Sequence, residues 1–305
     1  MDPFFKRTGR NCLILLAGWL VALSCNNAVA QPYPTEFQRV ELIDGLKNAV
    51  NFEFAPDGRV FLIDRFGEII IYKPDQQITV SAGTIPVFHE LEDGLLAIEF
   101  DPNFLSNNHI YLHYSPVSPS VNRVSRFTMS GDVVDLNSEV ILLDWPTQRE
   151  ICCHSAGDLA FDSQGNLYIA VGDNTNHSLY ATLNETDPTA SSENTSSNTN
   201  DLRGKILRIK PQPNGTYTVP SGNLFPGGNG GLPEIYVMGA RNPYRIYVDS
   251  ENNDWLYWGE VGPDADNDGP DGPKGLDEIN LTKQAGNFGW PYFSGKNQAY
   301  RNTYN

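Results

Sequence analysis

Residues 52–74 read FEFAPDGRVFLIDRFGEIIIYKP, and this stretch decides the fold. An apolar segment leads into the turn Pro56-Asp57-Gly58, a second apolar segment ends at Asp64, and a third follows a turn at Gly67. Short apolar runs separated by Pro, Asp and Gly are typical of antiparallel strands joined by hairpins. The stretch therefore predicts three consecutive strands of one sheet.

The same pattern returns later in the chain. LAFDSQGNLYIAVGD at 159–173 matches FEFAPDGRVFLID, and GKILRIKP at 204–211 matches GEIIIYKP at 67–74. Residues 174–203, rich in Ser, Thr and Asn, separate the two halves of this copy and predict a mobile insertion loop. Further copies begin at 98–102 and 246–249. Since the chain after residue 30 lacks sustained helical periodicity, repeated sheets arranged as the blades of an all-β propeller are expected.

Composition and charge limit the partners. Charged residues make up 19% of the chain, which also has 27 Gly and 21 Pro, and this suits many short strands joined by tight turns. The formal charge is −16, and because residues 1–30 carry a net +2, the remainder carries −18. So acidic a surface repels nucleic acid and anionic membranes, and favours neutral substrates or bound cations.

The first 30 residues have the parts of a secretory signal peptide. Three basic residues precede an apolar run at 12–23, and Ala28-Val29-Ala30 follows it. The run is too short to favour a permanent membrane span. We expect residues 1–30 to be removed and residues 31–305 to be a secreted or periplasmic propeller domain. Cys25, which follows Ala-Leu-Ser, leaves a lipoprotein as an alternative.

A histidine and an aspartate flank the predicted strand pair of the later copy. His154 and Asp173 are nineteen positions apart, and an up-and-down pair of strands returns its far ends to one sheet edge. An imidazole oriented by a carboxylate is a common general base near neutral pH. The alternative is a surface histidine and an aspartate that merely ends a strand.

Cleavage after Ala30 leaves two cysteines, Cys152 and Cys153, directly before His154. In an oxidising compartment adjacent cysteines stay as thiols, pair with another chain or close a vicinal disulfide. Burial as two small residues is a further alternative, and the sequence leaves all of these open.

Four motifs follow in order: MGARNPYRI at 238–246, GEVGPD at 259–264, DEINL at 277–281 and GNFGWP at 286–291. Together with the His–Asp pair, this set resembles the soluble glucose and sorbosone dehydrogenases that use pyrroloquinoline quinone (PQQ), a family of six-bladed β-propellers. The resemblance covers about residues 52–292. Six blades of about 40 to 50 residues need more chain than follows the signal, so we expect the propeller to be incomplete at its C-terminus.

The resemblance implies roles for the matched residues. His154 stands for the base that takes the proton of the anomeric hydroxyl while hydride leaves the sugar carbon, and Asp173 for the carboxylate that holds this base. Arg241 matches the arginine that contacts the quinone carbonyl and stabilises negative charge there. Asn242 matches the adjacent asparagine that contacts the cofactor. Glu92 stands where glucose-oxidising members have a glutamine that touches cofactor and sugar, a departure that weighs against glucose as the substrate.

Calcium (Ca2+) is the expected metal. The resemblance implies that backbone carbonyls of Gly262 and Pro263 complete a calcium pocket formed by the cofactor. Alternating aspartates follow at Asp264, Asp266 and Asp268 and are similar to calcium-binding loops in general. The run lacks the glutamate at the twelfth position of an EF-hand, so a solvated acidic loop is the alternative.

These features predict a quinoprotein sugar dehydrogenase. The expected reaction is PQQ-dependent oxidation of an aldose or related sugar to a lactone or acid, with hydride transfer to the quinone and a separate electron acceptor. The chain has no Walker loop, no Gly-x-Gly-x-x-Gly opening a helix and no Gly-x-Ser-x-Gly elbow, so nucleotide and serine-hydrolase chemistry are not indicated.

A second class of function stays open from the sequence. A non-catalytic, calcium-stabilised propeller would bind carbohydrate or a protein partner, as the hedgehog-interacting relatives of the family do. The His154–Asp173 pair and the Arg241-Asn242 pair favour chemistry, whereas Glu92 favours binding.

Overall fold

The computed structural model describes residues 37, 40–150, 152–175, 191–268 and 273–299. The chain divides after Asp44 into two units, and all the described strands lie in the second unit, residues 45–305. The predicted signal peptide and residues 176–190 of the predicted insertion lie outside the described residues.

The quoted stretch forms three strands of a four-stranded antiparallel sheet. The strands follow chain order and are β1 (Ala49–Phe54), β2 (Val60–Asp64), β3 (Glu68–Lys73) and β4 (Ile78–Thr84). Gly67 is needed between β2 and β3, because its φ is +106° and a Cβ there would overlap the carbonyl oxygen of Ile85. The turn residues of the sequence thus set the β2–β3 connection.

Three further sheets follow in the second unit. The next contains β5 (Leu95–Phe100), β6 (His109–Tyr114), β7 (Val121–Ser130) and β8 (Val133–Pro146), with the short helix α1 (Phe104–Asn107) after β5. The third contains β9 (Asp158–Phe161), β10 (Leu167–Val171), β11 (Lys205–Pro211), β12 (Tyr217–Thr218), β13 (Ile235–Met238) and β17 (Gly286–Asn287), with the 3-10 helix η2 (Pro226–Gly228) before β13. The fourth contains β14 (Pro243–Val248), β15 (Leu256–Glu260) and β16 (Glu278–Thr282), and a small hairpin, β18 (Phe293–Ser294) with β19 (Gln298–Ala299), follows.

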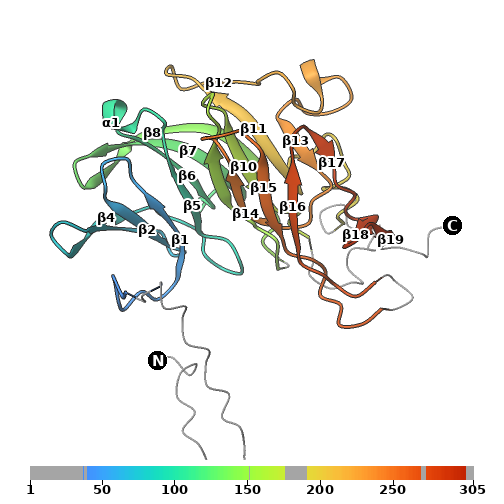
Figure 1. Ribbon diagram of the computed structural model, residues 1–305, viewed down its shortest axis with the longest axis horizontal. Helices are drawn as coiled ribbons and strands as arrows, with labels where there is room; N and C mark the ends of the chain where they lie inside the picture. The colour runs from blue at the N-terminus through green and yellow to red at the C-terminus, as the bar shows by residue number, and fades with distance from the viewer. Residues whose placement is uncertain (1–36, 38–39, 151, 176–190, 269–272, 300–305) are drawn as a thin grey trace, which may run out of the picture. The chain divides into compact units, whose positions relative to one another are not determined.

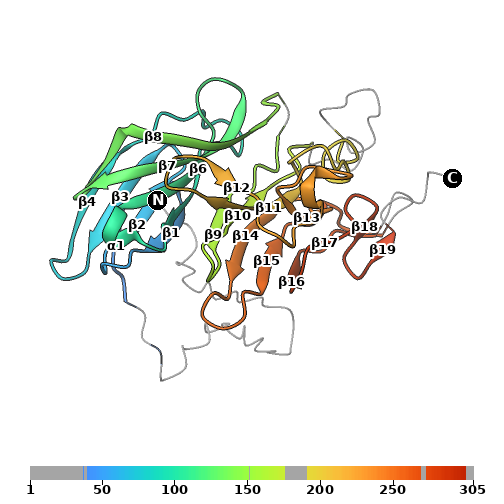
Figure 2. The same cartoon turned by 90° about the horizontal axis from the view of Figure 1, so that it is seen from above.

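The first strands of these sheets contact one another in succession, β1 with β5, β5 with β9 and β9 with β14. Figure 1 and Figure 2 show the sheets side by side in chain order, from the blue β1–β4 to the orange and red β14–β16. This is the arrangement of propeller blades, and the described residues hold four of them. The sequence copies at 98–102 and 246–249 overlap the ends of β5 and β14, which are first strands of blades, as predicted.

Both faces of the inner blades are buried. Along β10, Leu167, Ile169 and Val171 pack into a core shared with the second blade. Tyr168 and Ala170 alternate with them and pack into a core shared with the fourth blade. Because successive side chains of a strand point to opposite faces, a fully apolar strand is buried on both sides by its neighbouring blades.

Three acidic residues lie on the first strands of three blades: Glu53 on β1, Glu99 on β5 and Asp158 on β9. Burial, with Asp158 as a second cause, raises the pKa of Glu53 to about 7. Burial raises the pKa of Asp158 to about 6, although Arg245 opposes this shift. Burial and the neighbouring Glu53 also raise the pKa of Glu99. These three carboxyl groups therefore keep their protons up to a higher pH in the folded protein than in the unfolded chain.

Glu53→Gln is expected to stabilise the protein more at pH 8 than at pH 5. The folded-state pKa of Glu53 lies above its unfolded value, so its contribution to stability is present below about pH 4.5 and is lost as pH rises through about 7. The glutamine amide carries no charge at either pH, so the variant does not lose this stability as pH rises. Thermal melts should show a gain in Tm over wild type that is at least about 3 °C larger at pH 8. Glu68→Gln, at the exposed start of β3, is the control, and an equal gain at both pH values would contradict the assignment.

Candidate active site

The third blade brings His154 and Asp173 together. His154 lies in the connection from β8 to β9, and Asp173 follows β10 after one glycine. Nδ1 of His154 is 2.6 Å from Oδ1 of Asp173, and the two residues are 3% and 0% exposed. The geometry expected from an up-and-down strand pair is therefore present, and the pair is buried rather than lying on the surface.

The carboxylate of Asp173 is surrounded by donors from several chain segments. Its Oδ1 accepts bonds from the backbone N–H and the hydroxyl of Thr175, at 3.1 and 2.9 Å. Its Oδ2 accepts bonds from Ser192 Oγ at 2.8 Å and from the indole N–H of Trp290 at 2.9 Å. Burial alone would raise the pKa of Asp173, but His154, Arg241 and Trp290 outweigh burial and lower that pKa to about 2. The carboxylate is therefore ionised at neutral pH.

The backbone of His154 adopts a left-handed conformation with a φ of +68°, which is unfavourable for a residue with a Cβ. Two contacts hold it there. The N–H of His154 donates to Oε2 of Glu92 at 2.6 Å, and its carbonyl accepts from the N–H of Asn174 at 3.1 Å. Glu92 also accepts from the N–H of Ser155 at 3.1 Å. One oxygen of the Glu92 carboxylate thus holds the backbone of the candidate base.

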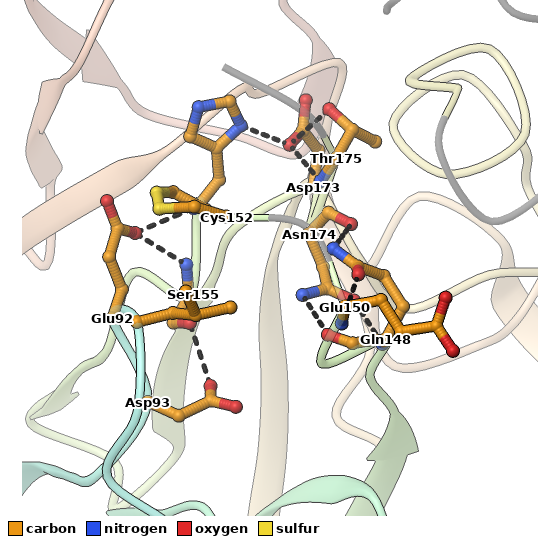
Figure 3. Close-up of a disulfide and its surroundings, with 12 residues drawn as sticks. Glu92, Asp93, Gln148, Glu150, Cys152, Ser155, Asp173, Asn174 and Thr175 are labelled. Carbon is orange, nitrogen blue, oxygen red and sulfur yellow. Dashed lines mark hydrogen bonds and ion pairs between the residues drawn. A yellow bond between two sulfur atoms is a disulfide. The ribbon is translucent and has the colours of Figure 1, made fainter.

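Cys152 and Cys153 form a vicinal disulfide in the structure, so among the alternatives left open by the sequence the intrachain disulfide is the one observed. Figure 3 shows Glu92 beside this disulfide, with Asp173 and Thr175 opposite. Both cysteines are half-buried. The disulfide and Glu92 together flank the segment that carries His154.

Gly172 is required where the His154 segment crosses the end of β10. A Cβ at this position would overlap the carbonyl oxygen of His154 and lie 2.9 Å from Oδ1 of Asn242. Gly172→Ala is expected to lower stability by about 1–3 kcal/mol, as overpacking does, and to displace His154. Gly259→Ala is the matched control, because a Cβ there would meet nothing within 4 Å. Chemical denaturation of both variants measures their free energies of unfolding. Equal values would show that the site tolerates a Cβ at position 172.

Arg241 and Asn242 lie between β13 and β14, next to the His–Asp pair. The carbonyl of Arg241 accepts from the N–H of Asp173 at 2.8 Å. The N–H groups of Arg241 and Asn242 both donate to Oε1 of Glu260, at 2.6 and 2.8 Å. Trp258 donates its indole N–H to Oε2 of Glu260 at 3.0 Å. Both residues are thus fixed through their backbone, and the Arg241 guanidinium also donates to the carbonyl of Val261 at 3.1 Å.

A cavity of about 640 Å³ opens beside Arg241. Arg241, Glu260, Gly262, Pro263 and Trp290 are among its lining residues, whereas His154 and Asp173 are not. The guanidinium carbon of Arg241 lies 5.8 Å from the centre of the Trp290 ring. Since the indole N–H of Trp290 also bonds Asp173, this tryptophan connects the cavity with the His–Asp pair.

The predicted metal ligands divide into two groups. Gly262 and Pro263 are buried at the cavity, and the N–H of Gly262 donates to Oδ1 of Asp277 at 3.0 Å. The aspartates at 264, 266 and 268 are exposed. Within the described ranges, the only group of three acidic, cysteine or histidine side chains whose ligand atoms lie within 4.8 Å of one another is Glu92, Cys152 and Cys153. The structure thus does not gather the aspartate run into a compact set of ligands.

Ser192, Glu260 and Trp290 are site residues that sequence reasoning missed. Glu260 and Trp290 stand inside GEVGPD and GNFGWP, so the motifs that carried the resemblance contained them without assigning them a role. Burial raises the pKa of Glu260 to about 7, although three N–H donors oppose this shift. Ser192 falls in the Ser/Thr/Asn-rich insertion, where composition gave no signal for a buried contact.

Comparisons with known proteins identify the family of the chain. The glucose/sorbosone dehydrogenase family matches residues 46–304. Aldose sugar dehydrogenase YliI of Escherichia coli (strain K12) is 26% identical over 279 residues, which are 90% of this chain and 67% of that protein. Quinoprotein glucose dehydrogenase B of Acinetobacter calcoaceticus is 26% identical over 275 residues, 85% of this chain and 53% of that protein. Human hedgehog-interacting protein is 26% identical over 239 residues, 70% of this chain and 32% of that protein.

Solved structures show the same propeller. A putative oxidoreductase (glucose dehydrogenase) of Thermus thermophilus has a TM-score of 0.65 and 27% identity, covering 84% of this chain and 68% of that one. The PQQ-bound aldose sugar dehydrogenase of Streptomyces coelicolor has a TM-score of 0.61 and 25% identity, covering 84% and 66%.

The fold is an all-β propeller, and the chain belongs to the glucose/sorbosone dehydrogenase family. It spans between about half and two thirds of the length of the two sugar dehydrogenases compared in sequence. Among the described residues, no helix is both long and apolar enough to cross a membrane.

Proposed function

We propose that the chain is a PQQ-dependent sugar dehydrogenase that oxidises an aldose or related sugar to a lactone or acid. The observation that carries this proposal is the buried His154–Asp173 pair, which is joined to Arg241 through the Asp173 backbone. Membership of the glucose/sorbosone dehydrogenase family and the similarity to a PQQ-bound aldose sugar dehydrogenase support it.

His154 is the general base in this proposal. Ionised Asp173 accepts the Nδ1–H of the neutral imidazole, and this leaves Nε2 as the proton acceptor. When Nε2 takes the proton of the sugar hydroxyl, the adjacent carboxylate stabilises the imidazolium. Glu92 keeps the ring in place by holding the backbone of its residue.

Several residues suit the quinone and its calcium. Oδ1 of Asn242 is buried without a hydrogen-bond partner in the part of the chain that is described, so a polar ligand group can satisfy it. Arg241 offers a buried cation at the cavity wall, and the backbone oxygens of Gly262 and Pro263 are hard donors that suit calcium. Bound PQQ would supply the two-electron acceptor for hydride, with Ca2+ as a Lewis acid on it. Arg241 would then stabilise the negative charge that develops.

Other properties, inferred from the sequence or implied by the resemblance to the family, stay proposals. They are a six-bladed ring, a signal peptide at 1–30, a secreted or periplasmic location, an insertion at about 174–203, an aldose-type small molecule as substrate and a separate electron acceptor as partner. The aspartates at 264, 266 and 268 stay candidates for a calcium loop beyond Gly262 and Pro263.

A second function is favoured by two observations. Human hedgehog-interacting protein is similar to this chain over 239 residues. The family resemblance also implies that Glu92 stands where the glucose-oxidising members have a glutamine. A calcium-stabilised propeller that binds carbohydrate or a protein partner without oxidising a sugar would keep the fold and lose quinone binding.

Titration of the purified protein with PQQ and Ca2+ separates the two functions. Cofactor absorbance reports binding, and dye reduction over a panel of aldoses reports turnover. If the protein is a dehydrogenase, quinone binding should be saturable and should be weakened by EDTA, and dye reduction should depend on the sugar. Arg241→Met should abolish quinone binding, whereas Arg59→Met, at a surface ion pair with Asp57, should not. Calcium uptake without quinone binding would favour the recognition protein.

A further inference from the structure

The described part of the insertion contains buried polar residues, although its composition is typical of a solvated loop. Ser192, Thr195 and Ser196 are fully buried, and backbone bonds close turns along residues 191–203. This stretch leads directly into β11 at Lys205. Polar composition did not indicate this burial, because the hydroxyls of Ser192 and Ser196 are hydrogen-bonded to acceptors inside the protein.

This buried segment, residues 191–204, bridges the two halves of the candidate site. On one side, Ser192 Oγ donates to Asp173 at 2.8 Å and the N–H of Gly204 donates to the carbonyl of Gly172 at 2.9 Å. On the other side, Ser196 Oγ donates to the carbonyl of Ala240, directly before Arg241, at 2.7 Å. The segment therefore contacts both the end of β10, next to Asp173, and the end of β13, next to Arg241.

Lys205 holds this segment from inside. The residue is 0% exposed, and its ammonium donates to the carbonyls of Thr195, Ser196 and Arg203, at 2.7, 2.9 and 2.8 Å. An ammonium has three donors, so these three carbonyls satisfy it completely.

Burial of this ammonium is costly without a counter-ion in contact. Among the described residues no carboxylate lies within ion-pair distance of it, and the charged groups around it are Asp201, Arg203 and Asp173. Burial, opposed by Asp201, lowers the pKa of Lys205 to about 7. A fully buried ammonium that donates to the carbonyls of Thr195, Ser196 and Arg203 ties the middle of this segment to its end.

We propose that Lys205 is a positioning residue of the candidate active site: it fixes residues 191–204, and these residues hold Asp173 and the Arg241 backbone in register. The inference rests on the proposed function, because it assigns Lys205 and Ser192 to the same site. The effect on the His154–Asp173 pair, however, can be measured without cofactor or sugar.

The test uses Lys205→Met, with Lys210→Met as the matched control on the exposed end of the same strand. The readout is the low-field proton NMR signal of the His154 Nδ1–H bonded to Asp173, identified by its loss in His154→Ala. We expect the signal to vanish or broaden in Lys205→Met and to persist in Lys210→Met. Sugar-dependent turnover should fall by about 10- to 100-fold, as for a small misplacement of a catalytic group, with little change in KM.

Ser192→Ala removes the bond of the segment to Asp173 and leaves the ammonium in place. Its effect and that of Lys205→Met should be non-additive in the double variant, because both act through the same segment. If Lys205→Met does not fold, Ser192→Ala carries the test alone. An unchanged low-field signal in a folded Lys205→Met or in Ser192→Ala would overturn the proposal. Loss of that signal in a protein that reduces no dye would keep the positioning role and reject the dehydrogenase.

Discussion

Sugar-dependent dye reduction is expected to fall by about 10²- to 10⁴-fold in His154→Ala, the usual effect of removing a proton-transfer residue. The imidazole is held by the buried, ionised carboxylate of Asp173, at 2.6 Å. Alanine removes the proton acceptor and leaves the sugar hydroxyl proton without a base. Because His154 does not line the cavity beside Arg241, quinone binding should survive the substitution.

Steady-state kinetics with saturating PQQ and Ca2+ make this measurement, and cofactor absorbance checks binding in the same samples. His89→Ala is the matched control, since His89 is exposed and its ring packs on Phe66 away from the pair. Turnover near the wild-type rate in His154→Ala would remove His154 from the chemistry. Loss of quinone binding in that variant would assign it to the cofactor pocket instead.

Asp173→Asn is expected to lower kcat by about 10⁴-fold. Losses of this size occur when the carboxylate beside a histidine base is replaced and the histidine is held in the wrong tautomer. The carboxylate accepts from His154, Thr175, Ser192 and Trp290, so an amide must turn its NH₂ toward at least one of these donors. If the NH₂ faces His154, Nδ1 has to accept and the proton moves to Nε2. The base is then blocked at the atom that must receive the sugar proton.

Acid stability gives an independent measurement for Asp173. Its folded-state pKa, about 2, lies below the value of 3.8 for an unperturbed side chain. The resulting stabilisation, about 2 kcal/mol, is present above about pH 4 and is lost as pH falls toward 2. Asp173→Asn should therefore unfold with a smaller difference between pH 5 and pH 2.5 than wild type. Asp75→Asn, at an exposed turn, serves as the control for both measurements, and wild-type turnover in Asp173→Asn would remove the orienting role.

Sequence alone predicted the parts of this structure that depend on local pattern. The apolar run at 167–171 and the turns at Gly58 and Gly67 define strands, because period and turn chemistry act over a few residues. The meeting of His154 and Asp173 could be predicted as well, since a strand pair fixes where its two ends lie.

Contacts between distant segments could not be predicted in the same way. Trp290 reaches Asp173 across 117 positions, and Glu92 reaches the His154 backbone across 62. Nothing in the local sequence of either residue indicates its partner. The burial of Ser192 and Ser196 could not be predicted for the same reason: they look like solvated loop residues until their acceptors, Asp173 and the carbonyl of Ala240, are placed beside them.

The crowded carboxylate of Asp173 has a consequence for the order in which the site is completed. Its donors come from four places along the chain, and the last of them, Trp290, lies 117 positions beyond it. The 117 positions up to Trp290 must therefore leave the ribosome before the Asp173 carboxylate can acquire its full set of donors. Until then the histidine beside it would be poorly oriented, so a nascent or nicked chain that has gained its early blades would still lack a working base. Chemical competence would then report that the late segments have docked.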